Sequence, residues 1–129
     1  MYTDLNAVTT ISSLGGGPIG AGWAAHFLSK GFKVKSYVHD IKEKSKYETI
    51  IKTAWNSLKE MGLHRKASLK NLMISSNLEE VLQETHFVQE SIPEILELKL
   101  NFYKILGELL PEHIIIASST SGLTMTEIQ

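Results

Sequence analysis

A glycine-rich segment near the N-terminus, residues 15–20, constrains the fold of this chain more than any other feature. It reads Gly-Gly-Gly-Pro-Ile-Gly, a G-x-G-x-x-G pattern, and it separates a strand candidate at 8–14 from a helix candidate at 18–30. In that position one glycine permits a tight turn, the second lets the backbone approach a phosphate, and the third allows close packing of helix on strand. The N–H groups at the start of the helix attract the same anion. The residues of this predicted nucleotide-binding turn are Gly15, Gly17, Pro18, Ile19 and Gly20.

Strand-like and helix-like segments alternate along the chain. Besides 8–14, short apolar runs predict strands at 32–38, 72–74, 87–89 and 114–117. Helical spacing of apolar residues predicts helices at 18–30, 47–61, 77–83 and 91–110, with a last helix from Thr124. This alternation predicts an α/β fold of Rossmann type, a doubly wound parallel sheet, as one domain over residues 1–129. Ligands bind such sheets at the carboxyl ends of the strands, where the loops 15–20, 38–40, 90–94 and 118–122 open.

Two polar stretches interrupt this apolar pattern. Ser12 and Ser13 are unusual in a central strand of a parallel sheet, and they need hydrogen-bond partners if they are buried. Charged residues of both signs follow the second strand candidate and predict a solvated helix face: Lys42, Glu43, Lys44, Lys46 and Glu48.

Composition narrows the classes of function. The net charge of −1 gives no electrostatic reason to expect binding to nucleic acid or to an anionic membrane. Because the chain has no cysteine, it has no disulfide, no thiolate metal site and no cysteine nucleophile, and no metal site is predicted. No apolar run approaches the ~20 residues of a membrane span, and the start does not read as a secretory signal. We therefore expect a cytoplasmic protein.

The glycine turn and three later segments together resemble a known family. These segments are Gln-Glu-Ser-Ile-Pro-Glu at 89–94, Leu98-Lys99, and Ser-Ser-Thr-Ser-Gly-Leu at 118–123. In order and spacing they resemble the N-terminal domain of the 3-hydroxyacyl-CoA dehydrogenase family, and Thr-Ala-Trp-Asn-Ser-Leu at 53–58 resembles its L-carnitine dehydrogenase branch. The resemblance implies a domain that binds NAD for the oxidation of a secondary alcohol beta to a carboxyl or thioester group.

The resemblance also implies roles for three residues outside the glycine turn. Glu94 and Lys99 match positions near the ribose and the nicotinamide, and Ser121 matches the serine that binds the oxygen of the substrate. Each has a plainer alternative. Glu94 can form a capping box with Ser91, Lys99 can be a solvated helix residue, and Ser121 can be a loop or cap hydroxyl.

One expected acid is displaced. In the family, an acidic residue at the end of the second strand holds the hydroxyls of the adenine ribose, and an ungapped match puts Val38 at that position. Asp40 lies two residues later and would substitute only if the loop is rearranged; otherwise it caps the following helix. Val38 therefore weakens the expected affinity for the cofactor and the expected preference for NAD over NADP.

The general base of the family is a histidine, held by a glutamate, on segments that follow the serine-rich loop. The 129 residues end before either of them and before the helical domain that completes the substrate pocket. We therefore expect a domain that binds NAD(H), takes a hydroxy acid substrate only if the C-terminal half is supplied, and is inactive alone. Apolar surface left uncovered predicts a homodimer. Two other possibilities stay open, a stand-alone nucleotide-binding module and a degenerate structural protein that binds no nucleotide.

Overall fold

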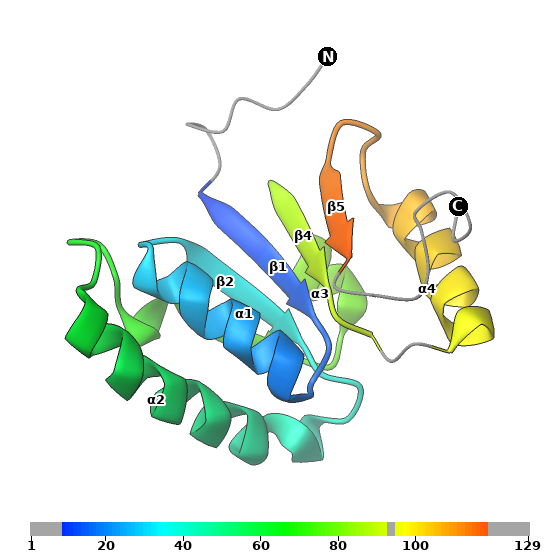
Figure 1. Cartoon of the computed structure of the whole chain (residues 1–129). Coiled ribbons are helices and arrows are strands. Elements are labelled where there is room, and N and C mark those ends of the chain that lie inside the picture. The colour runs from blue at the N-terminus through cyan, green and yellow to red at the C-terminus, as the bar shows by residue number, and fades with distance from the viewer. Residues whose placement is uncertain (1–8, 93–94, 119–129) are drawn as a thin grey trace.

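The computed structural model describes residues 9–92 and 95–118. Five parallel strands form one sheet in the order β3-β2-β1-β4-β5 (Figure 1). The strands are β1 (Thr10–Leu14), β2 (Lys33–Tyr37), β3 (Leu72–Ser75), β4 (Phe87–Glu90) and β5 (Ile115–Ser118). The order reverses between β1 and β4, which makes their carboxyl ends the switch point where a doubly wound sheet binds ligands. The predicted α/β fold of Rossmann type is confirmed.

Helices cover both faces of the sheet and form two hydrophobic cores. They are α1 (Pro18–Ser29), α2 (Lys44–Met61), α3 (Leu78–Leu82) and α4 (Leu96–Leu109), with the 3₁₀ helices η2 (Ile41–Glu43) and η3 (Leu69–Asn71). On one face, α1 and α2 bury Val34, Tyr47 and Trp55 in a shared core. On the other, α3 and α4 pack Val81 and Leu106 against β1 and β4. Among the residues that the structure describes, no helix is both long and apolar enough to cross a membrane.

The serines of β1 have the hydrogen-bond partners that their burial requires. Both side chains are fully buried. Ser12 Oγ lies 2.6 Å from the carbonyl oxygen of Val81 and 2.8 Å from Thr85 Oγ1, and Ser13 Oγ donates to the carbonyl oxygen of Gly20 at 3.3 Å. The buried serine hydroxyls of this central strand therefore both have hydrogen-bond partners. Ser12 connects β1 to the region of α3, and Ser13 connects it to α1.

One helix begins later than the sequence predicts. We expected a helix from Ser91, whereas α4 begins at Leu96 after Ile95, which has extended backbone angles. The reason is local: proline at 93 disfavours a helical conformation at Ile92, and the backbone N–H of Ile92 donates to the carboxylate of Glu90. The helix expected from Thr124 lies outside the described residues.

Candidate cofactor-binding cleft

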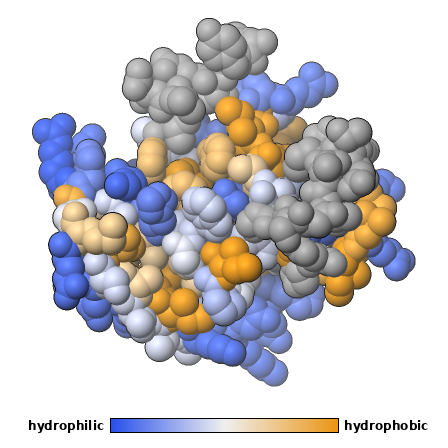
Figure 2. Space-filling view, in the orientation of Figure 1, coloured by the Kyte–Doolittle hydropathy of each residue, from blue (hydrophilic) through white to orange (hydrophobic). Residues whose placement is uncertain are grey.

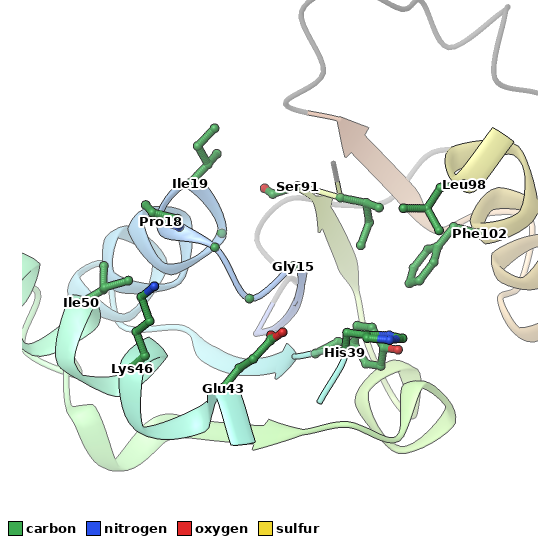
Figure 3. A pocket seen from close by; sticks show the side chains of 15 residues that line it. Gly15, Pro18, Ile19, His39, Glu43, Lys46, Ile50, Ser91, Leu98 and Phe102 are labelled. Carbon is green, nitrogen blue, oxygen red and sulfur yellow. The ribbon is translucent and has the colours of Figure 1, made fainter. Parts of the chain in front are cut away.

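A cleft of about 760 Å³ opens at the carboxyl edge of the sheet. The glycine turn at 15–20 forms its floor, the segment from the end of β2 to α2 forms one side, and the start of α4 with the end of β4 forms the other (Figure 3). It therefore lies at the switch point of the sheet, and its volume falls within the range of small-molecule and cofactor sites.

Two glycines of the turn are required by close backbone packing. Gly15 has a φ of +130°, which L side chains rarely adopt, and a Cβ atom added to it would lie 2.6 Å from the carbonyl oxygen of Ser91. A Cβ atom on Gly20 would collide with the carbonyl oxygen of Gly15. The first glycine thus allows the chain to leave β1 against β4, and the third allows α1 to pack against the turn.

Gly17 has a different environment. A Cβ atom there would meet nothing within 4 Å, so the space over Gly17 is open to the cleft. Gly17 is the N-cap of α1 and Pro18 follows at its first position, with no acidic residue in the first turn. The first N–H groups of a helix have no intrahelical partner, and their partial positive charge here meets no carboxylate of the same turn. This end of the helix fits a phosphate.

On the β2 side, an exposed glutamate lines the cleft, and the valine that directly follows β2 is buried in the core and does not line it. Val38 is fully buried, and its Cγ1 atom lies 3.3 Å from the Cβ position of Gly16. Asp40 caps η2, because its Oδ1 atom accepts a hydrogen bond of 2.9 Å from the backbone of Lys42. Glu43 and Lys46 line the cleft, whereas Asp40 does not.

On the β4 side, a buried ion pair stands behind the cleft wall. Lys99 Nζ lies 3.0 and 2.9 Å from the two carboxylate oxygens of Glu90, and both side chains are almost fully buried. The hydroxyls of Tyr103 and Ser118 donate to the same carboxylate at 3.1 and 2.8 Å. Burial, followed by the charge of Glu90, raises the pKa of Tyr103 above its ordinary value. Leu98 and Phe102, on the same helix, face the cleft instead.

Sequence comparison identifies the family. The family model described as 3-hydroxyacyl-CoA dehydrogenase, NAD binding domain, matches residues 10–129. The chain belongs to this family. NAD is the cofactor of the family domain, and the open space at Gly17, the acid-free first turn of α1 and the size of the cleft fit a dinucleotide.

Relatives of this NAD-binding domain include L-carnitine dehydrogenases. The enzyme of Nocardiopsis dassonvillei is 39% identical over 127 residues, which are 98% of this chain and 39% of that protein. The enzyme of Streptomyces griseus is 40% identical over 122 residues, 95% of this chain and 36% of that protein. The NAD-binding domain described here therefore spans about two fifths of the length of these relatives.

Solved structures of the same fold agree with this assignment. A 3-hydroxybutyryl-CoA dehydrogenase of Escherichia coli K12 superposes with a TM-score of 0.82 at 26% identity, over 94% of this chain and 26% of that one. A diketoreductase gives a TM-score of 0.82 at 25% identity, over 94% of this chain and 44% of that one. The NAD-binding domain thus shares its backbone arrangement with dehydrogenases of several substrates.

The structure brings some of the predicted site residues together and separates others. The glycine turn, from Gly15 through Gly17, Pro18 and Ile19 to Gly20, lines the cleft, and the binding of the cofactor by these residues stays a prediction. Lys99 is only 1% exposed, so the alternative of a solvated helix residue is wrong, and its place near the nicotinamide stays a prediction. Glu94 and Ser121 lie outside the described residues.

Sequence reasoning missed two charged residues of the cleft. It placed Glu43 and Lys46 on a solvated helix face, yet both line the cleft of the NAD-binding domain. They stand three residues apart, at the beginning of a helix, so they share one side of it. That spacing, directly after the strand whose end faces the glycine turn, was the available signal.

Proposed function

We propose that this chain binds NAD(H) in the cleft as the cofactor domain of a dehydrogenase that oxidises a 3-hydroxy acid of the L-carnitine or 3-hydroxyacyl-CoA type. The observation that carries the proposal is the glycine turn. Gly15 and Gly20 are packed so tightly that no side chain fits, while Gly17 opens to the cleft at the N-terminus of α1. A pyrophosphate at that point would receive hydrogen bonds from backbone N–H groups without a side chain in its way.

The resemblance to the family suggests roles for two further residues, Ser121 and Glu94. Ser121 would orient the oxygen of the substrate beside the nicotinamide, and Glu94 would lie near the ribose. Bound NAD would supply the hydride acceptor for the oxidation of the alcohol. Within the described residues, the wall formed by Ile92, Leu98 and Phe102 contributes apolar surface on the β4 side of the cleft, which would exclude water from a bound cofactor.

The test compares two glycine variants of the 129-residue chain. Gly17→Ala adds a methyl group where a phosphate would approach, whereas Gly22→Ala adds one to the same helix, outside the cleft and also without contacts within 4 Å. Titration with NADH is expected to show that Gly17→Ala weakens binding about tenfold or more, which is about 1.4 kcal/mol, and that Gly22→Ala leaves it unchanged. Equal affinity of both variants would contradict the assignment of the turn. Absence of NADH binding by the unmodified chain would reject the function and favour a structural module.

We also propose that the chain self-associates through α4. Large apolar side chains of this helix are 40–47% exposed: Leu96, Leu98, Leu100, Ile105 and Leu109. Apolar colour on the α4 side of the molecule is visible in Figure 2. Leu96 and Leu100 share one side of the helix, and Leu98, Ile105 and Leu109 share another. Exposed apolar side chains favour association. Light scattering on the purified chain should report a dimer that Leu100→Lys, placed on the solvent side of α4 and away from the cleft, converts to a monomer.

A further inference from the structure

The end of β2 offers no carboxylate to a bound nucleotide. In dinucleotide-binding sheets of this kind, an acidic residue after the second strand accepts a hydrogen bond from a ribose hydroxyl. The residue that directly follows β2 is Val38, which is buried in the core that α1 and α2 share. A ribose placed beside the glycine turn therefore needs an acceptor from another part of the chain.

The carboxylate of Glu43 lies beside the glycine turn, on the β2 side of the cleft. Glu43 ends η2, and its side chain reaches back over the cleft toward the glycine turn (Figure 3). A Cβ atom on Gly16 would collide with Glu43 Oε2, and it would lie 3.3 Å from Val38 Cγ1. The side chains of Val38 and Glu43 therefore both approach Gly16; Val38 is buried, whereas Glu43 is exposed.

Glu43 is not used for local structure. Among residues 9–92 and 95–118, its carboxylate makes no hydrogen bond or ion pair, and it does not cap α2 with its side chain although it is the N-cap residue. Asp40, three residues earlier, differs in both respects: its carboxylate caps η2 and it does not line the cleft. The plainer explanation for an acid at a helix start is its interaction with the helix dipole. That explanation does not require the side chain to point into the cleft.

We propose that Glu43 is the residue that binds the adenine ribose, accepting hydrogen bonds from its 2′- and 3′-hydroxyls, and that it selects NAD over NADP. The inference rests on the proposed function. A 2′-phosphate placed at the same point would be repelled by the carboxylate and would lose the hydroxyl donor. Lys46, which lines the cleft one turn along α2, is a cation that can attract a phosphate once the negative charge of Glu43 is removed.

The experiment uses two variants that each remove one negative charge from the same segment. Glu43→Gln keeps the size of the side chain in the cleft, and Asp40→Asn keeps the capacity to cap η2, since asparagine caps as well as aspartate. NADH and NADPH are titrated against the unmodified 129-residue chain and both variants, with ADP and 2′-deoxy-ADP as probes of the ribose alone. Melting temperatures of the three proteins establish that each is folded.

The expected results separate Glu43 from its neighbour. The unmodified chain and Asp40→Asn should bind NADH at least about tenfold more tightly than NADPH, the discrimination of a charge-assisted hydrogen bond. Glu43→Gln should lose about tenfold in NADH affinity and bind the two cofactors within about threefold of each other. ADP should bind more tightly than 2′-deoxy-ADP, and this preference should be smaller in Glu43→Gln, whose amide oxygen is a weaker acceptor than a carboxylate.

Three results would overturn the inference. If Glu43→Gln binds both cofactors as the unmodified chain does, the cleft binds NAD(H) without Glu43, and only the proposed function stands. If Asp40→Asn alone loses the preference for NADH, the ribose acceptor is Asp40. If the unmodified chain binds no nucleotide, the proposed function and the inference both fail.

Discussion

Two glutamates at the same edge of the sheet have opposite environments. Glu90 ends β4 and is fully buried, and its carboxylate accepts hydrogen bonds from an ammonium group, two hydroxyls and the backbone N–H of Ile92. Glu43 ends η2, is exposed, and borders the cleft, and its carboxylate makes no hydrogen bond or ion pair in the described part of the chain. Glu90 is the last residue of β4 and Glu43 follows β2, the two strands that flank β1.

The difference shows what decides whether an acidic side chain supports the fold or remains available to a ligand. Removing Glu90 from water is tolerated because Lys99 supplies an opposite charge and the hydroxyls satisfy its other lone pairs. The carboxylate of Glu90 is therefore paired within the protein. The carboxylate of Glu43 is exposed to solvent, so a ribose hydroxyl can reach it without breaking a contact within the described part of the protein. Substitutions at the first should change stability, and substitutions at the second should change binding.

The largest effect is expected when Glu90 loses its counter-charge. Lys99→Met leaves a buried carboxylate without a cation, which costs about 3–5 kcal/mol of unfolding free energy. Urea denaturation measures this loss. Lys104→Met, at an exposed position of the same helix, is the control and should lie within ~0.5 kcal/mol of the unmodified chain.

The double variant Glu90→Gln/Lys99→Met sharpens that result. With both charges gone, no unpaired ion remains buried, so the double variant should be more stable than Lys99→Met alone. If Lys99→Met is as stable as the unmodified chain, the ion pair does not support the β4 edge and the contrast between the two glutamates fails.

A smaller loss is expected from Tyr103→Phe. The substitution removes the hydroxyl that donates to Glu90 at 3.1 Å and keeps the ring that packs in the core of α3 and α4. Hydrogen bonds to charged groups contribute about 1.5 kcal/mol or more, and urea denaturation should show a loss of this size. A change below ~0.5 kcal/mol would mean that Glu90 is satisfied without Tyr103.

Alkaline pH tests the buried tyrosines in another way. Burial raises the pKa of Tyr103 and the pKa of Tyr47, whose hydroxyl donates to Ser36 Oγ at 2.7 Å. The folded state therefore holds each proton more tightly than the unfolded chain does, so the stability is present below pH ~10 and is lost as the pH rises through the folded pKa. Both tyrosines should contribute to this decline of the unfolding free energy above pH ~10. Tyr47→Phe should show a shallower decline than the unmodified chain, and an equal decline would contradict the assignment.

The smallest effect on stability is expected at Glu43. Because its side chain is exposed and is not a cap, Glu43→Gln should unfold within ~0.5 kcal/mol of the unmodified chain in the same urea measurement. A loss as large as that of Tyr103→Phe would show that Glu43 supports the fold, and the comparison of the two glutamates would no longer separate fold from binding.

The fold could be predicted because its determinants are local. Each strand and helix carries its own periodicity, and the glycine turn marks the first connection by residue type alone. The partners of Ser12 could not be predicted, since Val81 and Thr85 lie far along the chain and meet it only after the sheet forms. A need for partners was visible, but their identity was not.

The candidate site could be predicted only where backbone conformation determines it. The glycines are specified by close approach of the backbone, which sequence records directly. The place of Glu43 in the site depends instead on the direction of its side chain, which is set by the Asp40 cap and the short helix η2. The environment of Lys99 depends on burial, because it is set by the ion pair with Glu90, nine residues earlier, and not by the pattern of the helix α4. The spacing of Glu43 and Lys46 places them on one side of a helix start, but it gives neither the direction of a side chain nor its burial.

The bond between Ser13 Oγ and the carbonyl oxygen of Gly20 has a consequence for the kinetics of binding. It links the end of strand β1 to the first residues of helix α1, on either side of the glycine turn that a phosphate would approach. The turn is therefore preorganised, and the entropy of ordering it is lost during folding rather than at association. A binding step that requires no loop ordering should be fast, so the residence time of the cofactor, more than its rate of arrival, would set the affinity.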